Sequence, residues 1–432
     1  MRWCSAEKDK ERVKSIAFTT LITLLILVIV FNILFQPLAG AFGTILFESG
    51  EFKSYFRVLF LFISFEILNA WVLDLIRIKG KPSIYVILSL VKFTSTLVLN
   101  IYFIKYQGMG VLGIILSQLI GSILLFLLSI VFISKNVKPV IHRGEIRPMF
   151  KYGFPLVFTT MSMYLLSLGD RFLMKYMLDL GEVGVYALGY KIATVSNLLV
   201  IQSFQIGFLP IAYRMYEKPG NERFFIKTLT YYSFVLVLFS LGISLFSKEL
   251  ITLLARSDEY LLAYTIVPFI SLAFVFKGIQ YIFSLSLHFV KNTKYNAFIV
   301  LGVALFNVLL NIILLPRMGI YGSGLASVIS FFIMLIFFRY FARRFFDPGY
   351  EVGKLLLMII LGIILYTVSL LFADLSLWIN IVLKLVLIVS FPFLLYLLKF
   401  YEKVEIDSIK GAVKKWNKPG DLFQNIKDFL NN

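Results

Sequence analysis

Two stretches of this chain resemble each other, LVLNIYFIKYQGMGVLG at residues 97–113 and VLLNIILLPRMGIYGSG at residues 308–324. An offset of 211 residues aligns Asn100, Gly108 and Gly113 of the first stretch with the same residue types in the second. Both stretches are mainly apolar around these three positions. The match predicts an internal repeat, in which two halves of the chain fold into similar bundles of helices.

The composition around this repeat is that of a membrane protein. Of the 432 residues, 59% are hydrophobic and only 15% are charged, whereas about a quarter of a soluble domain is charged. A spanning helix needs about 20 mainly apolar residues, and continuous rather than alternating apolar runs disfavour a β-barrel. The chain is therefore predicted to be all-α, with about twelve transmembrane helices in two pseudo-symmetric bundles. The predicted spans are 15–36, 55–77, 84–104, 108–134, 152–178, 183–210, 225–247, 261–288, 296–315, 319–342, 353–373 and 377–399.

Positive charge alternates between the predicted loops. The chain carries 42 Lys and Arg against 24 Asp and Glu. The N-terminal segment 1–14 and every second loop after it hold 30 of the 42 Lys and Arg residues. The loops between them hold 6, and the remaining 6 lie within predicted spans. Because cytoplasmic loops are enriched in Lys and Arg, both termini are predicted to be cytoplasmic, and no nucleic-acid partner is expected. The basic linker 135–151 is expected to contact anionic lipid headgroups.

The repeat also predicts how the domains are arranged. The second repeat unit begins near Lys151, and subtracting 211 gives about position −60, so the hairpin 152–210 has no partner in the first unit. We therefore expect a parent fold of fourteen spans from which this chain lacks the first two, the alternative being a natural twelve-helix variant. The expected domains are an N-terminal lobe (1–134), the linker (135–151), a C-terminal six-helix lobe (152–342), two extra helices (343–400) and a cytoplasmic tail (401–432).

Ionisable residues inside spans cost about 2.5–3.5 kcal/mol each and usually face a bundle interior or a water-filled cavity. In the hairpin 152–210, Asp170 and Arg171 precede the outer turn by about as many residues as Lys191 follows it. At a rise of about 1.5 Å per residue the three groups lie at similar depth. An Asp170–Lys191 ion pair is one interpretation. Arg171 then still adds a net positive charge, which favours a cavity for an anionic substrate.

Three further groups belong to the candidate cavity or to its alternatives. Glu66 and Lys92 are about level across their shared inner turn, which favours an ion pair, although Lys92 is also a candidate cavity residue. The offset of 211 places Lys277 on Glu66, and no carboxylate is evident at its depth.

The helix 183–210 carries polar residues that suit either sugar hydroxyls or contacts between helices. The candidates on it are Tyr186, Tyr190 and Asn197.

The same sequence argues against an enzyme. The predicted outer loops are short, with fewer than about twenty residues each, and leave no room for the external catalytic domain of a polymerase or glycosyltransferase. One cysteine and two well-separated histidines suggest neither a disulfide nor a metal site. The phosphate-binding loop of ATPases is not found. No cofactor is expected.

Residues 149–193, MFKYGFPLVFTTMSMYLLSLGDRFLMKYMLDLGEVGVYALGYKIA, carry a family resemblance. The runs at 169–173 and 184–193 resemble the seventh and eighth helices of the polysaccharide transporter family, within the superfamily of multidrug, oligosaccharidyl-lipid and polysaccharide exporters. The resemblance implies twelve or fourteen spans in two lobes. It also implies a plasma (cell inner) membrane flippase that moves an undecaprenyl-pyrophosphate-linked oligosaccharide outward by alternating access for surface polysaccharide biosynthesis.

The implied partners are this lipid-linked substrate, membrane lipids, and the polymerase and glycosyltransferases of polysaccharide synthesis. Two alternatives stay open. One is a multidrug cation antiporter of the same superfamily, which the basic balance of the in-span residues disfavours. The other is a membrane partner of the synthesis machinery that does not itself transport.

Overall fold

The computed structural model describes residues 9–255, 257–290, 294–372 and 375–407. Two compact units make up the chain, Met1–Leu156 and Val157–Asn432. The boundary falls inside one long helix, α7 (Arg143–Met177). The predicted tail lies outside the described residues beyond position 407.

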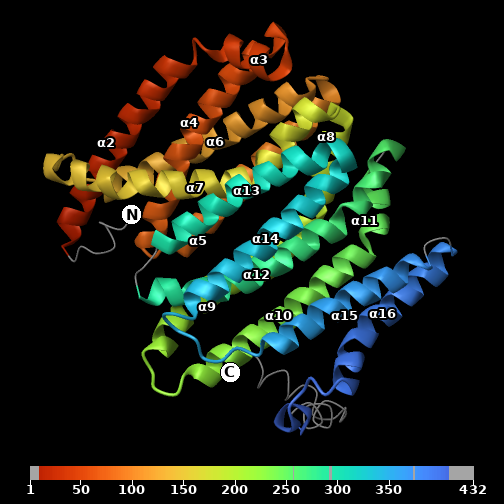
Figure 1. Ribbon diagram of the computed structural model, residues 1–432. Coiled ribbons are helices and arrows are strands. Elements are labelled where there is room, and N and C mark those ends of the chain that lie inside the picture. Colours follow the sequence, from red (N-terminus) through yellow and green to blue (C-terminus); the bar gives the residue numbers. More distant parts are fainter. Residues whose placement is uncertain (1–8, 256, 291–293, 373–374, 408–432) are drawn as a thin grey trace, which may run out of the picture. The chain divides into compact units, whose positions relative to one another are not determined.

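Unit 1 is a bundle of helices in which α4 packs between α2 and α6, and α5 packs along α6 (Figure 1). Its core is built from the apolar side chains of α2, α4 and α6, among them Trp71, Leu75 and Leu125. Asp9 caps α2, since its carboxylate accepts a hydrogen bond from the Glu11 amide. The elements are α2 (Lys10–Phe35), α3 (Ala39–Phe47), η1 (Gly50–Phe52), α4 (Lys53–Ile78), α5 (Pro82–Ile101), the π-helix η2 (Tyr102–Tyr106), α6 (Gly110–Asn136) and the start of α7.

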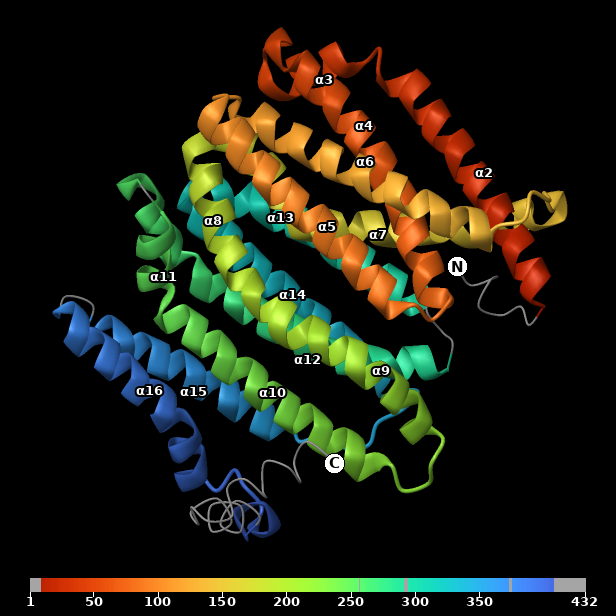
Figure 2. The ribbon, with the colours of Figure 1, turned by 180° about the vertical axis from the view of Figure 1, so that it is seen from behind.

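Unit 2 is larger and is centred on α12, which packs against α8, α10 and α14. The helices α15 and α16 pack against each other and against α10, as the view from behind also shows (Figure 2). The elements after α7 are α8 (Leu180–Ser196), the π-helix η3 (Asn197–Gln202), α9 (Ser203–Tyr216), α10 (Glu222–Leu245), α11 (Ser247–Leu254), η4 (Asp258–Thr265), α12 (Val267–Phe289), α13 (Lys294–Met318), α14 (Ile320–Ala342), α15 (Val352–Leu370) and α16 (Leu377–Leu397).

The two units repeat the same order and packing of helices. Adding 211 to the bounds of α2, α4, α5 and α6 gives ranges that overlap α10, α12, α13 and α14. The packed pairs also correspond, since α2–α4, α4–α6 and α5–α6 in unit 1 match α10–α12, α12–α14 and α13–α14 in unit 2. Among the described helices of unit 1, none corresponds to the α7–α8–α9 hairpin of unit 2. The predicted internal repeat is present in the fold.

The residues that define the repeat have local structural roles. Gly108 and Gly319 adopt φ angles of 63° and 56°, a left-handed conformation that suits glycine. A Cβ at Gly113 would lie 2.8 Å from the Cβ of Phe103, and one at Gly324 would lie 3.1 Å from the Cβ of Phe269. Both units therefore use one glycine for a turn and another for close packing.

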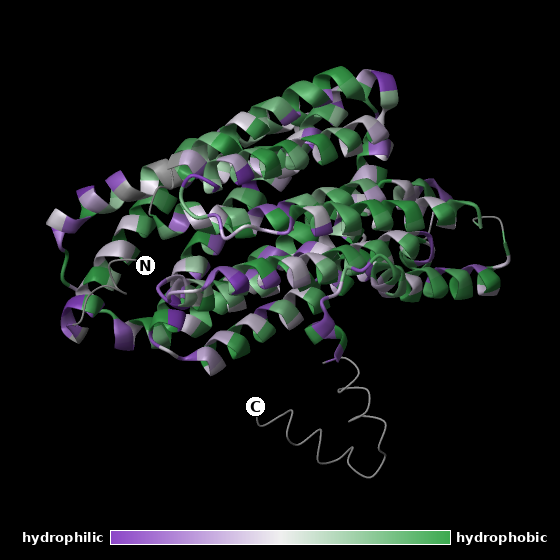
Figure 3. Cartoon of the chain, turned by 60° about the horizontal axis from the view of Figure 1, so that its bottom comes forward, coloured by the Kyte–Doolittle hydropathy of each residue, from purple (hydrophilic) through white to green (hydrophobic). Residues whose placement is uncertain are grey.

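All twelve predicted spans fall on helices of the structure. In the described part of the chain, eleven helices are long and apolar enough to cross a membrane. The exception is the predicted span 152–178 in α7, whose 35 residues extend about 52 Å. This helix is less apolar than the others, because charged residues lie at both of its ends and Asp170 and Arg171 lie within it. Apolar residues cover most helical surfaces, and hydrophilic residues are common at the helix ends (Figure 3).

Candidate functional site: a cationic and aromatic cluster in unit 2

Asp170 is the buried centre of the site. Its side chain is 2% exposed. One carboxylate oxygen accepts hydrogen bonds from the Arg171 amide at 2.9 Å and from Arg171 Nη1 at 3.0 Å. The other accepts a 2.6 Å hydrogen bond from the Tyr186 hydroxyl on α8. The predicted Asp170–Lys191 ion pair is therefore wrong. Tyr186 occupies the place opposite Asp170, while Lys191, more than one helical turn further along α8, is exposed.

Arg171 is held in one orientation by its neighbours. Its Nη1 also donates a 2.7 Å hydrogen bond to the carbonyl of Ser167, one turn earlier on α7. The guanidinium lies over the Tyr190 ring, 4.1 Å from the centroid, a cation–π distance. Its side chain remains 19% exposed. In the described part of the chain, the side-chain hydrogen bonds of Arg171 use Nη1 alone. Nε and Nη2 are therefore available to an anion, which a guanidinium can bind through two parallel hydrogen bonds.

A second cation contacts the same aromatic cluster. Tyr190 contacts Phe274 of α12 edge to face, with ring centroids 5.6 Å apart. The ammonium of Lys277 lies 5.4 Å from the centroid of Phe274. No ion pair joins Lys277 to a carboxylate among the residues that the structure describes. Arg171 and Lys277 thus each contact one ring of an aromatic pair, and Asp170 is the carboxylate of the cluster.

A buried polar network lies in α13 and α14 beside Tyr186. The Ser323 hydroxyl, which faces the region of Tyr186, donates a 2.7 Å hydrogen bond to Asn311 Oδ1. The Asn311 amide donates to Asn307 Oδ1 at 3.1 Å, and the Asn307 amide donates to the Ser330 hydroxyl at 3.0 Å. All five side chains are essentially buried. The network is therefore continuous from Ser330 to Ser323, and the hydrogen bond from Tyr186 to Asp170 is separate from it.

Sequence reasoning identified only part of this arrangement. Asp170, Arg171, Tyr186 and Tyr190 of the predicted set form one cluster, and Lys277 joins it through Phe274, a residue that the sequence did not single out. The network members Asn307, Ser323 and Ser330 were also missed, and Asn311 was noted only as a marker of the repeat. The available signal was the i, i+4 spacing of Asn307 and Asn311, which places both on one face of an apolar helix.

The remaining candidates lie elsewhere. Lys191 is exposed on α8, and no described residue forms an ion pair with it. Asn197 is buried and begins the π-helix η3, a local widening that is often found at functional sites. Lys92 lies in unit 1 and donates a hydrogen bond to Glu66, which also accepts one from Ser122 at 2.5 Å. The predicted Glu66–Lys92 ion pair is confirmed.

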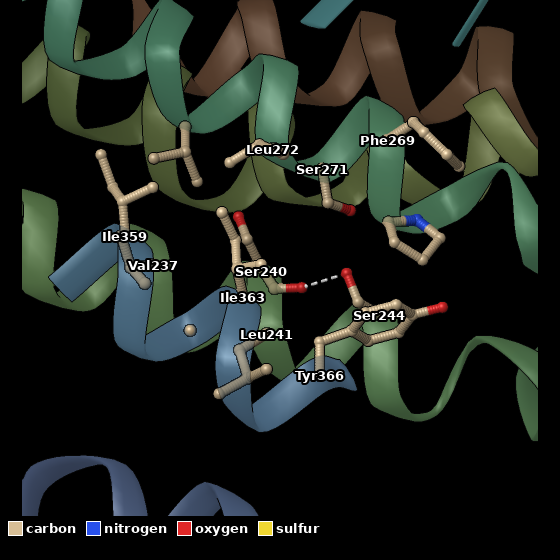
Figure 4. Close-up of a pocket in the computed structure, with 13 residues that line it drawn as sticks. Val237, Ser240, Leu241, Ser244, Phe269, Ser271, Leu272, Ile359, Ile363 and Tyr366 are labelled. Carbon is tan, nitrogen blue, oxygen red and sulfur yellow. Dashed lines mark hydrogen bonds between the residues drawn. The ribbon is translucent and has the colours of Figure 1, made fainter. Parts of the chain in front are cut away.

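A separate cavity of about 220 Å³ lies between α10, α12 and α15. No charged side chain lines it, and Ser244 donates its 2.8 Å hydrogen bond to the Ser240 carbonyl (Figure 4). It therefore lacks the charge that an anionic headgroup requires. Within the described ranges, no three His, Cys, Asp or Glu side chains are grouped as a metal site requires. The lining residues are Val237, Ser240, Leu241, Ser244, Pro268, Phe269, Ser271, Leu272, Val275, Ile359, Gly362, Ile363 and Tyr366.

Comparison with solved structures identifies the fold. An inward closed lipid II flippase MurJ matches with a TM-score of 0.73 and 18% identity, over 92% of this chain and 87% of that one. An inward-facing MATE family multidrug resistance transporter of the MOP superfamily matches with a TM-score of 0.63 and 16% identity, over 78% of this chain and 82% of that one. At these identities the likeness concerns the fold. The protein has the fold of a multi-pass membrane transporter.

The family follows from the sequence. Residues 5–261, more than half of the chain, match the family model described as polysaccharide biosynthesis protein. The chain belongs to this family, as the resemblance predicted. An uncharacterized membrane protein of Methanocaldococcus jannaschii is 25% identical over 231 residues, covering 52% of this chain. That match spans 45% of the length of the archaeal protein, less than half of it.

Proposed function

We propose that this protein is a flippase that moves a lipid-linked oligosaccharide across the membrane, and that the cluster around Arg171 and Lys277 binds its anionic headgroup. The observation that carries the proposal is that Arg171 and Lys277 contact the aromatic pair Tyr190–Phe274. The nearby carboxylate of Asp170 already accepts hydrogen bonds from Arg171 and Tyr186. The fold and the family agree with transport in polysaccharide biosynthesis.

The physical task is to move a pyrophosphate and its sugars through about 30 Å of hydrocarbon. The unused guanidinium donors of Arg171 and the ammonium of Lys277 replace water around the phosphates. The lipid tail stays in the bilayer. An inside-negative membrane potential favours outward movement of an anion by about 2.3 kcal/mol per charge and per 100 mV. An undecaprenyl-pyrophosphate repeat unit satisfies this chemistry, and alternating access between two lobes is the proposed motion.

The proposed setting is the plasma membrane, with both termini in the cytoplasm. The distribution of positive charge between the loops supports this orientation. The polymerase and the glycosyltransferases that make and use the lipid-linked repeat unit are the proposed protein partners, since they must supply this substrate and consume the product.

Two other functions are less compatible with the site. A multidrug cation antiporter needs a carboxylate that can bind a cationic drug. Asp170 is 2% exposed and already accepts three hydrogen bonds from Arg171 and Tyr186. A non-transporting partner of the synthesis machinery has no use for the unpaired donors of Arg171 inside an apolar helix bundle.

The test is a measurement of surface polysaccharide in cells that depend on this protein. Arg171→Ala and Lys277→Ala are each expected to lower the polymer strongly at an unchanged amount of membrane-inserted protein. Arg57→Ala serves as the matched control, because Arg57 is an exposed cation within a span of unit 1. If both site variants yield normal polymer, the proposed headgroup site is wrong. If the polymer is normal even when the gene is deleted, the proposed transport function itself is wrong.

A further inference from the structure

A second cavity lies in unit 1, between α2 and the beginning of α7, and has a volume of about 560 Å³. It shares no residue with the cluster around Arg171, and its residues play no part in the proposed transport site. One wall comes from α2 and the other from the end of the basic linker and the first turns of α7. The lining residues are Thr19, Ile22, Thr23, Ile26, Ile141, Arg143, Ile146, Arg147 and Phe150.

The charge in this cavity comes from two arginines. Arg143 and Arg147 are four residues apart at the start of α7, so their side chains lie on the same face of the helix. Both are exposed. Among the described residues neither forms an ion pair, and the neighbouring carboxylate of Glu145 contacts Arg12 instead, at 3.5 Å. Two adjacent guanidinium groups without a carboxylate can bind a phosphate group.

The other polar side chains of the cavity already form hydrogen bonds within the protein. The Thr19 hydroxyl donates to the Ser15 carbonyl at 2.9 Å and accepts a hydrogen bond from the His142 amide at 3.0 Å. The Thr23 hydroxyl donates to the Thr19 carbonyl at 2.8 Å. The rest of the lining is four isoleucines and Phe150. A small hydrated phosphate would leave these apolar walls in contact with water, at a cost of about 25 cal/mol per Å².

Polar and apolar parts are ordered along the cavity. The hydrogen bond between Thr19 and His142 joins the two walls where α7 is about to begin. From there Ile26 lies seven residues further along α2, about 10 Å, and Phe150 lies about as far into α7. The arginine side chains can extend toward the polar end while their stems line the cavity. This order matches a molecule with an anionic head and an apolar chain.

We infer that this cavity binds an anionic phospholipid, with its phosphate on Arg143 and Arg147 and an acyl chain along Ile22, Ile26 and Phe150. The arginine pair supplies the charge complementarity and the isoleucines supply the apolar contact. A bound lipid of this kind ties the beginning of α7 to α2. The inference goes beyond a general attraction of the basic linker to anionic lipid headgroups, because it assigns lipid binding to two of the five Lys and Arg residues of the linker.

The test is lipid retention by the purified full-length protein. The protein is reconstituted in equal amounts of phosphatidylglycerol and phosphatidylcholine, extracted in mild detergent and examined by native mass spectrometry. The wild type is expected to retain phosphatidylglycerol selectively. Arg143→Gln with Arg147→Gln is expected to lose about thirtyfold of this selectivity, since each basic residue contributes about 1 kcal/mol. The matched control is Lys135→Gln with Lys151→Gln, which removes equal charge from the same linker outside the cavity and is expected to retain the lipid.

A second variant tests the apolar wall. Thr23→Phe narrows the cavity while both arginines remain, and it is expected to reduce phosphatidylglycerol retention. Equal losses in the arginine variant and the lysine control would overturn the inference in favour of general electrostatic anchoring. Equal retention of both lipids would overturn it in favour of a purely apolar crevice. Displacement of the lipid by millimolar inorganic phosphate would show a site for a free anion and would also overturn it.

Discussion

Glu66 on α4 and Lys277 on α12 occupy equivalent positions of the two units, and their environments differ. Glu66 is paired with Lys92 and accepts a hydrogen bond from Ser122, so the charge inside unit 1 is balanced by its own helices. Lys277 contacts the ring of Phe274, and no described carboxylate pairs with it. The repeat therefore keeps the fold while the charge changes sign. The in-span charge of unit 1 is neutralised by its own helices, whereas that of unit 2 has no described carboxylate partner, as the proposed headgroup site requires.

The equivalent helix pairs differ in the same way. In α13–α14, Asn311 bonds to Ser323. At the equivalent positions of α5–α6 the residues are Asn100 and Leu112, and the buried Oδ1 of Asn100 has no hydrogen-bond partner. Unit 1 thus builds the same helix pair without the polar network. The network is not required for the fold of the repeat, and we propose that in unit 2 it orders the helices beside Tyr186.

The largest expected effect follows from removal of the buried carboxylate. Asp170→Ala leaves the donors of Tyr186 and Arg171 without their acceptor in a desolvated place. Breaking a buried ion pair costs about 3–5 kcal/mol, and the partial exposure of Arg171 argues for the lower end. Thermal unfolding in detergent measures the loss. Glu66→Ala in unit 1 is the comparison. Because the Glu66–Lys92 pair is more exposed, a smaller loss of stability is expected; equal losses of stability in the two variants would contradict the difference between the units.

A reversal of charge at the second cation is expected to affect function more than stability. Lys277→Glu gives unit 2 the residue type found at position 66 in unit 1. A carboxylate beside a pyrophosphate repels it, and like charges in contact cost several kcal/mol, so transport is expected to fall about a hundredfold. A flipping assay in proteoliposomes checks this. Lys277→Arg keeps the charge and is expected to keep most activity, whereas similar loss in both variants would argue for packing rather than charge.

An exchange between the two helix pairs has a smaller expected effect. Ser323→Leu introduces the unit 1 residue and removes one buried hydrogen bond, which costs about 1–3 kcal/mol when a partner is left unsatisfied. If Ser323 positions the site, transport falls while Ser323→Thr retains it. The converse change, Leu112→Ser, offers Asn100 a partner and is expected to leave transport unchanged. Equal effects of the two exchanges on transport would remove the proposed role of the network.

The smallest expected effect concerns pH. Lys227 on α10 forms an ion pair with Glu402, with 2.6 Å between the ammonium nitrogen and a carboxylate oxygen. The equivalent position on α2 of unit 1 is occupied by the buried Ile16, which has no charge. The hydrogen bond from Lys227 holds the pKa of Glu402 below its ordinary value of 4.5. Because the folded-state pKa is lowered, the contact stabilises the folded chain above pH 4.5 and is lost as pH falls through the lowered value. Glu405 also binds Lys227, at 3.1 Å; burial raises its pKa, but hydrogen bonds from Tyr231, the Glu402 amide and Lys227 together lower it. Hydrogen exchange of residues 400–407 is expected to rise as pH falls through the lowered values, and Glu402→Gln with Glu405→Gln is expected to remove this pH dependence; exchange that stays pH-dependent in this double variant would contradict the assignment.

The sequence predicted the helices, the repeat and one ion pair because each depends on spacing along the chain. Glu66 and Lys92 are level across a short turn, and depth alone brought them together. Depth did not suffice for Asp170, because the partner also depends on which face of α8 points toward α7. Tyr186 has that orientation and Lys191 does not. The contact between Tyr190 and Phe274 joins helices distant in sequence, so no local pattern could reveal that Lys277 belongs to the same cluster.

The most direct test of the headgroup site is the binding of a pyrophosphate lipid to the purified protein. Calorimetric titration with undecaprenyl pyrophosphate and with the uncharged undecaprenol compares the wild type with the Arg171→Ala/Lys277→Ala double variant. The predicted result is that the variant loses about tenfold or more of its affinity for the pyrophosphate lipid and none for undecaprenol. Equal affinity of the two proteins for undecaprenyl pyrophosphate would contradict the account.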